Sequence, residues 1–178
     1  MTLTVTCVTP PSASAIADWY EDADLLDSYA VTLAPEASAD LTALTNALFN
    51  SPPAWIQGLL RLRDRLMRPL GVKTTDEIRQ AGAIDGRDRI GFFPVFRRSP
   101  SEIILGEDDR HLDFRASVLL QADDGAGPRR LVVTTAVRCH NLLGRVYLSV
   151  IRPFHVLIVR SNLGRVLECA RIAGQTAP

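Results

Sequence analysis

The most regular alternation of apolar and polar residues in this chain runs from Arg110 to Gln121. One set of alternate positions is apolar (Leu112, Phe114, Ala116, Val118 and Leu120), and the other set is mainly polar (His111, Asp113, Arg115, Ser117 and Gln121). A period of two predicts a β-strand with one buried face, and a slip of one residue would bury the charges. We therefore expect the apolar set to face the core, with His111, Asp113 and Arg115 on the outer face.

Other stretches around this strand also predict β-structure. An early strand is expected at Leu26–Leu33, and three more at Ile90–Arg97, Glu102–Gly106 and Arg129–Cys139. Pro94 makes Ile90–Arg97 an edge or bulged strand, because proline cannot donate a ladder hydrogen bond. The short links after residue 98 predict an antiparallel meander, in which Arg129–Cys139 pairs with Arg110–Gln121.

Helical periodicity marks three segments. Ser38 is the expected N-cap of a helix at Ala39–Phe49, and Ser51-Pro52-Pro53 predicts the start of a second helix that ends near Leu70. A long C-terminal helix is expected from Asn141 to about Ile172, with a kink near Pro153 or a break near Gly164.

This order of elements predicts an α+β fold of the helix-grip type. A curved antiparallel sheet would wrap around the long C-terminal helix, with two short helices after the first strand, because only that helix is long enough to cover the apolar face of the sheet. Folds of this kind leave a hollow between helix and sheet, which is a natural small-molecule site. We expect an N-terminal arm at residues 1–24, a single domain at 25–173 and a tail at 174–178.

Composition narrows the function classes. The chain has 178 residues with 47% hydrophobic and 22% charged residues and a net charge of zero, so nothing global indicates nucleic acid or an anionic membrane. The longest apolar run, Leu142–Val159, contains Arg145, Arg152, Pro153 and His155, which argues against a membrane span.

The termini and the cysteines indicate the compartment. The first residues lack a basic segment and are interrupted by Pro10-Pro11, which is unlike a signal peptide. Three widely spaced cysteines, Cys7, Cys139 and Cys169, favour a reducing compartment over a disulfide framework. We therefore expect a cytoplasmic protein. Cys139 lies on the apolar face of its strand and is expected to be an inert core residue.

Three blocks of sequence stand out together: Ser51–Trp55 with Leu60–Asp64, Leu105–Arg115, and His140-Asn141 with Leu143–Arg145 and Arg152–His155. In composition and in order, these blocks resemble the DUF2867 family of bacterial domains. The resemblance covers about residues 25–165. It implies the START-like (SRPBCC) superfamily, with a helix-grip fold and a ligand cavity. Some relatives carry the domain behind an NAD(P)-binding, dehydrogenase-like domain. Here no glycine-rich phosphate loop follows a strand, so no cofactor is expected.

The leading functional hypothesis is a binding module for a hydrophobic or amphipathic small molecule or lipid. The expected ligand-binding residues come from the central strand and the helices: Trp55, Leu112, Phe114, Ala116, Tyr147, Ile151, Arg152, Phe154 and His155. The aromatic residues would form the wall. Arg152 would either extend from the helix to hold a carboxylate or phosphate or form an ion pair with the acidic turn at Glu107-Asp108-Asp109.

An acid–base enzyme of the cyclase or hydrolase type is the second hypothesis. His111 and His140 lie at the facing ends of the predicted hairpin, where Asp109 and Asp113 could complete a proton-transfer pair. The alternative is a cross-strand charge ladder of Asp113 with Arg115 and Arg138. No spacing typical of a metal site occurs, and no metal is expected.

A third hypothesis concerns the second predicted helix. Arg61, Arg65 and Arg68 form a basic stripe, which is either a solvated face or a surface that docks a protein partner, such as an NAD(P)-binding, dehydrogenase-like protein.

Overall fold

The computed structural model describes residues 4–34, 37, 40–50, 52–68, 77, 88–121 and 128–175. In chain order its elements are β1 (Thr6–Cys7), η1 (Ala17–Trp19), β2 (Leu25–Thr32), α1 (Leu41–Phe49), α2 (Ala54–Met67), β3 (Arg89–Ile90), β4 (Phe93–Arg98), β5 (Glu102–Asp108), β6 (Leu112–Gln121), β7 (Arg130–Cys139) and α4 (Leu142–Gln175).

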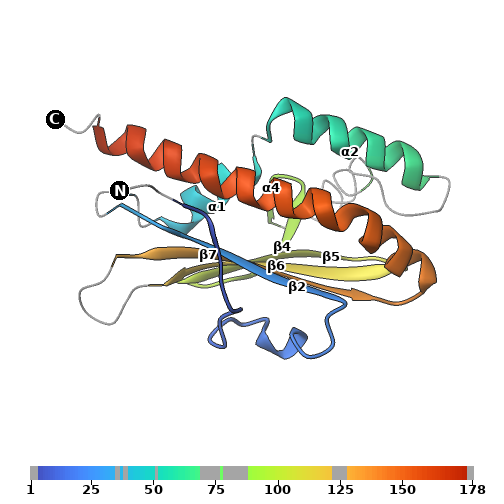
Figure 1. Ribbon diagram of the computed structural model, residues 1–178. Coiled ribbons are helices and arrows are strands. Elements are labelled where there is room, and N and C mark those ends of the chain that lie inside the picture. Colours follow the sequence, from blue (N-terminus) through green and yellow to red (C-terminus); the bar gives the residue numbers. More distant parts are fainter. Residues whose placement is uncertain are drawn as a thin grey trace.

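The strands form one seven-stranded antiparallel sheet with the order β1-β2-β7-β6-β5-β4-β3. The predicted meander and its hairpin are confirmed, with Phe114 opposite Val137 and Ala116 opposite Thr135. The curved sheet carries α1, α2 and α4 on one face, while the N-terminal segment with η1 crosses the other face (Figure 1). The α+β architecture with a long C-terminal helix on a curved sheet is therefore confirmed.

The main core lies between the sheet and helices α1 and α4. Alternate residues of β2, β6 and β7 point into it, as the period of two predicts, and they meet leucines of α1 and residues near the middle of α4. Its fully buried members include Val31, Val118, Leu131, Leu48 and Leu163. Each buried aliphatic side chain of this size contributes roughly 1.5–3 kcal/mol.

The opposite face of the sheet is also largely covered, which the alternation in the sequence did not predict. Ile16 of the N-terminal segment packs against Ile104 and Ala136, and Trp19 and Tyr20 extend this second cluster. Ser117 on the polar side of β6 is buried as a result. Only part of the predicted outer face is therefore exposed to solvent.

The cap of α1 differs from the predicted one, whereas the cap of α4 is the predicted residue. Asp40, rather than Ser38, caps α1, since its carboxylate accepts hydrogen bonds from the N–H groups of Thr42 and Ala43. The predicted cap Ser38 lies outside the described residues, as do Ser51 and Leu70 at the two ends predicted for the second helix. Asn141 caps α4 as expected, because its Oδ1 accepts from the N–H of Gly144 at 3.0 Å.

Helix α4 is continuous from Leu142 to Gln175 and contains Pro153. The break predicted near Gly164 is therefore wrong. Glycine lowers helix propensity by only about 1 kcal/mol, and the flanking residues Leu163 and Val166 are buried in the main core, which outweighs that cost. Figure 1 shows α4 as one bowed helix running along the sheet.

The strand predicted at Ile90–Arg97 is wrong in detail, because the chain turns within it. Gly91 adopts a positive φ of 65°, and the turn at Gly91-Phe92 separates β3 from β4. A side chain at Gly91 would also meet the carbonyl oxygen of Phe49 at 2.9 Å, so the position requires glycine. The predicted irregularity of this strand is present as a register shift between Val95 and Arg97.

The start of α4 is fixed closely against the start of β6. The carbonyl oxygen of His111 accepts a hydrogen bond from the N–H of His140 at 2.9 Å, and a Cβ on Gly144 would collide with that same carbonyl. Glycine at this position therefore permits the first turn of the helix to lie directly on the β6–β7 hairpin, which sets the height of α4 above the sheet.

Candidate functional site

A cavity of about 360 Å³ lies between the sheet, α4 and α2. The sheet wall comes from β2, β6 and β7, and the helical walls come from α2 and the middle of α4. Most of the lining is aliphatic or aromatic. This volume lies at the lower end of the range for small-molecule pockets, about 300–1,000 Å³.

Most of the ligand-binding residues predicted from the sequence line this cavity. Those that do are Leu112, Phe114, Ala116, Tyr147, Ile151, Phe154 and His155. They converge because the inner side chains of β6 lie two residues apart, and those of α4 lie three or four residues apart on one face of the helix.

Trp55 and Arg152 do not line the cavity. Trp55 is 45% exposed, and its neighbour Ile56 occupies the inward position on α2 instead. Arg152 follows the cavity residue Ile151 and is exposed. In both cases a step of one residue, about 100° around the helix, separates the inward from the outward position.

The arginine that does line the cavity is Arg63 of α2, which the sequence reasoning missed. Its Nε donates a hydrogen bond to the hydroxyl of Tyr147 at 3.0 Å, and Nη1 pairs with Asp64 at 2.7 Å. Burial opposes its charge, but the contacts with Tyr147 and Asp64 outweigh burial, so the pKa of Arg63 is raised and the group stays protonated. The cavity wall therefore includes a fixed cation.

The signal for Arg63 was present in the spacing of the sequence. Ile56, Leu59 and Leu60 define the inward stripe of α2, and Arg63 continues it at the seventh position after Ile56. A charged residue on an apolar stripe is an exception that indicates either a pairing or a functional site.

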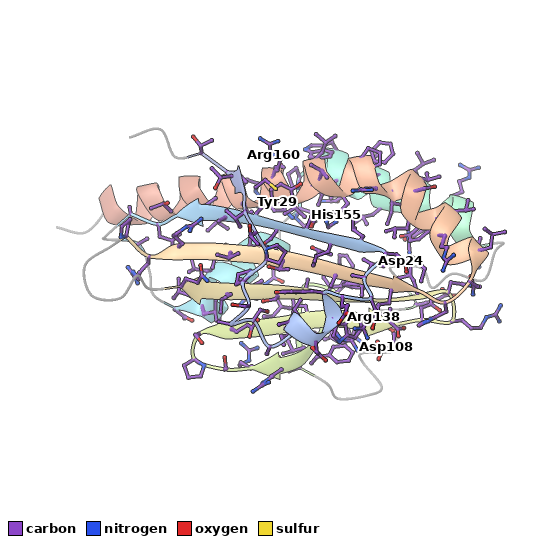
Figure 2. The ribbon with its side chains drawn as sticks, turned by 60° about the horizontal axis from the view of Figure 1, so that its bottom comes forward. Asp24, Tyr29, Asp108, Arg138, His155 and Arg160 are labelled. Atoms are coloured by element: carbon purple, nitrogen blue, oxygen red, sulfur yellow. The ribbon has the colours of Figure 1, made fainter. Side chains whose placement is uncertain are left out.

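His155 is a second polar residue in the cavity wall, after Arg63. Its Nε2 lies 3.2 Å from both carboxylate oxygens of Asp27, which projects from the inner face of β2. Figure 2 shows His155 on α4, next to the strand that carries Tyr29. A histidine held by a carboxylate has a fixed ring orientation, so this pair can present the other ring nitrogen as a proton donor or acceptor.

Asn162, two turns of helix beyond His155 on the inner side of α4, is another polar residue in the cavity wall. It lines the cavity and is 8% exposed, and its Oδ1 is buried without a hydrogen-bond partner among the described residues. A buried acceptor without a partner costs roughly 1–3 kcal/mol. Since Asn162 lies in the cavity wall, a bound molecule with a donor group could satisfy it.

The predicted acid–base residues are not gathered in the cavity. His140 and Asp113 do come together, with Nε2 3.0 Å from the carboxylate, but the His140 side chain is 44% exposed. The prediction that His111 lies on the outer face is wrong. It is 6% exposed and its Nδ1 lies 3.1 Å from Nδ2 of Asn141, because the start of α4 closes over this end of β6. Asp109 alone of the four candidates lines the cavity.

The outer face carries a stack of rings and guanidinium groups rather than the predicted ladder of Asp113, Arg115 and Arg138. The Arg115 guanidinium lies 4.4 Å from the Trp19 ring centre and 3.8 Å from that of Phe96, and Arg138 lies 4.5 Å from Trp19. Figure 2 places Arg138 and Asp108 close to η1 on this face. Arg115 also pairs with Asp108 at 2.6 Å. These contacts hold η1 on the sheet.

Cys139 is partly buried, and burial, followed by the charge of Asp24, raises the pKa of its thiol to about 11. The thiol is therefore protonated at neutral pH, consistent with an inert residue. Within the described ranges, no group of three or more His, Cys, Asp or Glu side chains is placed to hold a metal ion.

The fold and the site define an α+β protein with an apolar cavity under its C-terminal helix. A family model described as "Protein of unknown function (DUF2867)" matches residues 19–162. The match spans most of the chain and includes all but one of the cavity residues, Leu163, so the protein belongs to this family. No curated protein and no solved structure matches the chain.

Proposed function

We propose that this protein binds a hydrophobic or amphipathic small molecule in the cavity between the sheet and α4. The observation that carries the proposal is the cavity itself. It is mostly apolar and about 360 Å³ in volume, and it occurs where a well-packed core would be filled. An apolar ligand body would remove the cavity lining from water at roughly 25 cal/mol per Å² of apolar surface.

The polar side chains in the cavity wall support a ligand that is amphipathic rather than a pure hydrocarbon. Arg63, His155 and Asn162 are polar groups in a mostly apolar wall, which also includes Glu107, Asp109 and Thr135. A few polar groups that fix the orientation of a ligand are typical of small-molecule sites. The ligand then has an apolar body and a hydrogen-bond donor, such as a hydroxyl or amide, that reaches Asn162.

We also infer that the fold is of the helix-grip, START-like type. A long C-terminal helix lying along the inner face of a curved antiparallel sheet, with a cavity between them, supports this assignment. A helix-grip architecture would support ligand binding only by analogy, because one fold can carry many functions.

Native mass spectrometry of the protein purified without detergent tests the proposal directly. We expect a bound species at a near-stoichiometric level, which denaturation releases and which has an apolar body with at least one donor group. If the protein is purely apo and also fails to bind 1-anilinonaphthalene-8-sulfonate, an amphipathic fluorescent probe, the binding proposal is overturned.

Replacing Asn162 by leucine is expected to change stability and affinity in opposite directions. The substitution removes the orphan Oδ1, so the free energy of unfolding of the empty protein should rise by about 1 kcal/mol. It also removes the acceptor, so the preference for a donor-bearing ligand should disappear.

The preference for a donor-bearing ligand is measured with two compounds of similar shape, 1-octanol and its methyl ether, which compete with the fluorescent probe for the cavity. Wild-type protein should bind the alcohol about fivefold more tightly, which corresponds to one hydrogen bond of about 1 kcal/mol, whereas Asn162→Leu should bind the two equally. Asn50→Leu, at an exposed asparagine outside the cavity, serves as the control and should retain the preference.

A further inference from the structure

The helical layer of this protein exposes a continuous apolar stripe. Along α4 the exposed side chains are spaced by four, four, four and three residues, which places them on one face of the helix: Leu142, Val146, Val150, Phe154 and Leu157. The stripe spans roughly 22 Å at 1.5 Å per residue. Single exposed apolar residues are ordinary, but an aligned row of this length indicates an interaction surface.

This surface is also strongly basic. The α2 residues 54–68 contain four arginines and one carboxylate, Asp64, which pairs with Arg63, and the α4 residues 142–166 contain four arginines and no carboxylate. Six of the eight arginines are exposed: Arg61, Arg65, Arg68, Arg145, Arg152 and Arg160. The chain as a whole is neutral with 20 residues of each sign, so the remainder of the chain carries the balancing excess of acids.

We propose that α4 and α2 form a surface that docks on an anionic lipid bilayer. The apolar stripe would enter the boundary between head groups and acyl chains, and the arginines on either side would contact the anionic head groups. Charge complementarity favours this occupant. A second copy of the chain would bring two basic surfaces together, which opposes such a dimer.

The length and composition of α4 are consistent with this surface. By those two criteria alone, Leu142–Val166 is long and apolar enough to cross a membrane, and it is the one such helix in the described part of the chain. However, its inner side packs on α1 and β2 and carries His155, paired with Asp27. The helix therefore lies on the bilayer in this proposal and does not span it.

The cavity opens onto the same surface. Leu62, Val150 and Phe154 are exposed, and they also line the cavity. A molecule that leaves the bilayer could enter the cavity there without crossing water. This loading step rests on the proposed ligand-binding function, whereas the docking itself does not.

Flotation of the full-length protein with vesicles tests the docking. We expect binding to vesicles of phosphatidylglycerol and phosphatidylcholine, weaker binding at higher salt and little binding to phosphatidylcholine alone. The double variant Arg61→Gln/Arg65→Gln should bind about 25-fold more weakly, from about fivefold per arginine. The variant Val146→Gln/Leu157→Gln, at stripe positions outside the cavity, should also lose binding while still binding the fluorescent probe.

The control is Arg97→Gln/Arg130→Gln, which removes the same charge from strands of the sheet and should bind vesicles as wild type does. Circular dichroism verifies that each variant is folded. Absence of vesicle binding, or equal binding by Arg61→Gln/Arg65→Gln and by the control, overturns the docking proposal. So does a dimer in light scattering that Val146→Gln/Leu157→Gln abolishes, because the stripe would then be a protein interface.

Discussion

Replacing Ala116 by phenylalanine is expected to weaken ligand binding by at least about 100-fold while leaving the fold intact. Ala116 lies on the inner face of β6 and lines the cavity. A benzene ring added there would occupy the space that a ligand needs. Overpacking usually costs about 1–3 kcal/mol, but here the ring enters empty volume and gains apolar burial, so we expect stability to change by less than about 1 kcal/mol.

Titration with 1-anilinonaphthalene-8-sulfonate measures the affinity, and urea unfolding measures the stability. The matched control is Ala43→Phe, which makes the same chemical change at an exposed position of α1 and should bind the probe as wild type does. If Ala116→Phe is folded and binds with wild-type affinity, the probe occupies another site and the cavity does not carry the function.

The inner half of this site could be predicted from the sequence because it depends on simple periodicity. Leu112, Phe114 and Ala116 follow the two-residue repeat of a strand, and Tyr147, Ile151 and Phe154 follow the spacing of one helix face. A helix that covers the more regularly apolar face of β6 must meet these residues. All six line the cavity.

The polar residues of the site were harder to predict, because their positions and partners depend on contacts between distant segments. Arg63 was not among the expected ligand-binding residues, although its position belongs to the inward stripe of α2. Asp27 was not considered, although it shares the inner face of β2 with Tyr29 and Val31, and only the packing of α4 brings His155 within 3.2 Å of it. A charged residue in phase with an apolar repeat is the signal that could have identified both.

Net charge was similarly uninformative about the surface. The neutral total argued against an anionic membrane, but a sum over the chain cannot reveal that six of the eight arginines of α2 and α4 are exposed on the helical layer. The basic stripe of α2 was visible in the sequence, whereas the position of α2 next to α4, on the same face of the sheet, depends on the tertiary arrangement (Figure 1).

The outer face of the sheet was the part of the fold that the sequence predicted least. The polar positions of β6 suggested exposure to solvent, yet Ser117 is buried beneath the N-terminal segment together with Ser14 and Glu102. Polar residues in a strand pattern are compatible with burial when they satisfy one another, and the partners here lie 15 and 103 residues apart from Ser117 in the chain.

This buried cluster provides the prediction with the largest expected effect on stability. Glu102 is 6% exposed, and its Oε1 accepts hydrogen bonds from the hydroxyls of Ser14 and Ser117, both at 2.5 Å. Its Oε2 accepts from the N–H of Ala15 at 2.9 Å. The carboxylate thus connects β5, β6 and the N-terminal segment.

Glu102→Ala should lower the free energy of unfolding by about 3 kcal/mol, since hydrogen bonds to a charged group are worth roughly 1.5–3 kcal/mol each and the Ala15 N–H would lose its partner. The two serine hydroxyls, 3.3 Å apart, can then bond to each other, which limits the loss. For a protein of this size the melting temperature should fall by roughly 6–12 °C. Glu102→Gln, which retains one acceptor oxygen, should cost less, and Glu21→Ala, an exposed glutamate of the same segment, should cost little.

A local measurement separates release of the N-terminal segment from general destabilisation. In a Trp55→Phe background Trp19 is the only tryptophan, and it reports on the segment through its stacking with Arg115 and Arg138. Glu102→Ala should shift its emission to longer wavelength in the folded protein, because Trp19 would become hydrated as the segment leaves the sheet. A loss of stability below about 0.5 kcal/mol with unchanged emission would mean that apolar packing around Ile16 holds the segment without the carboxylate.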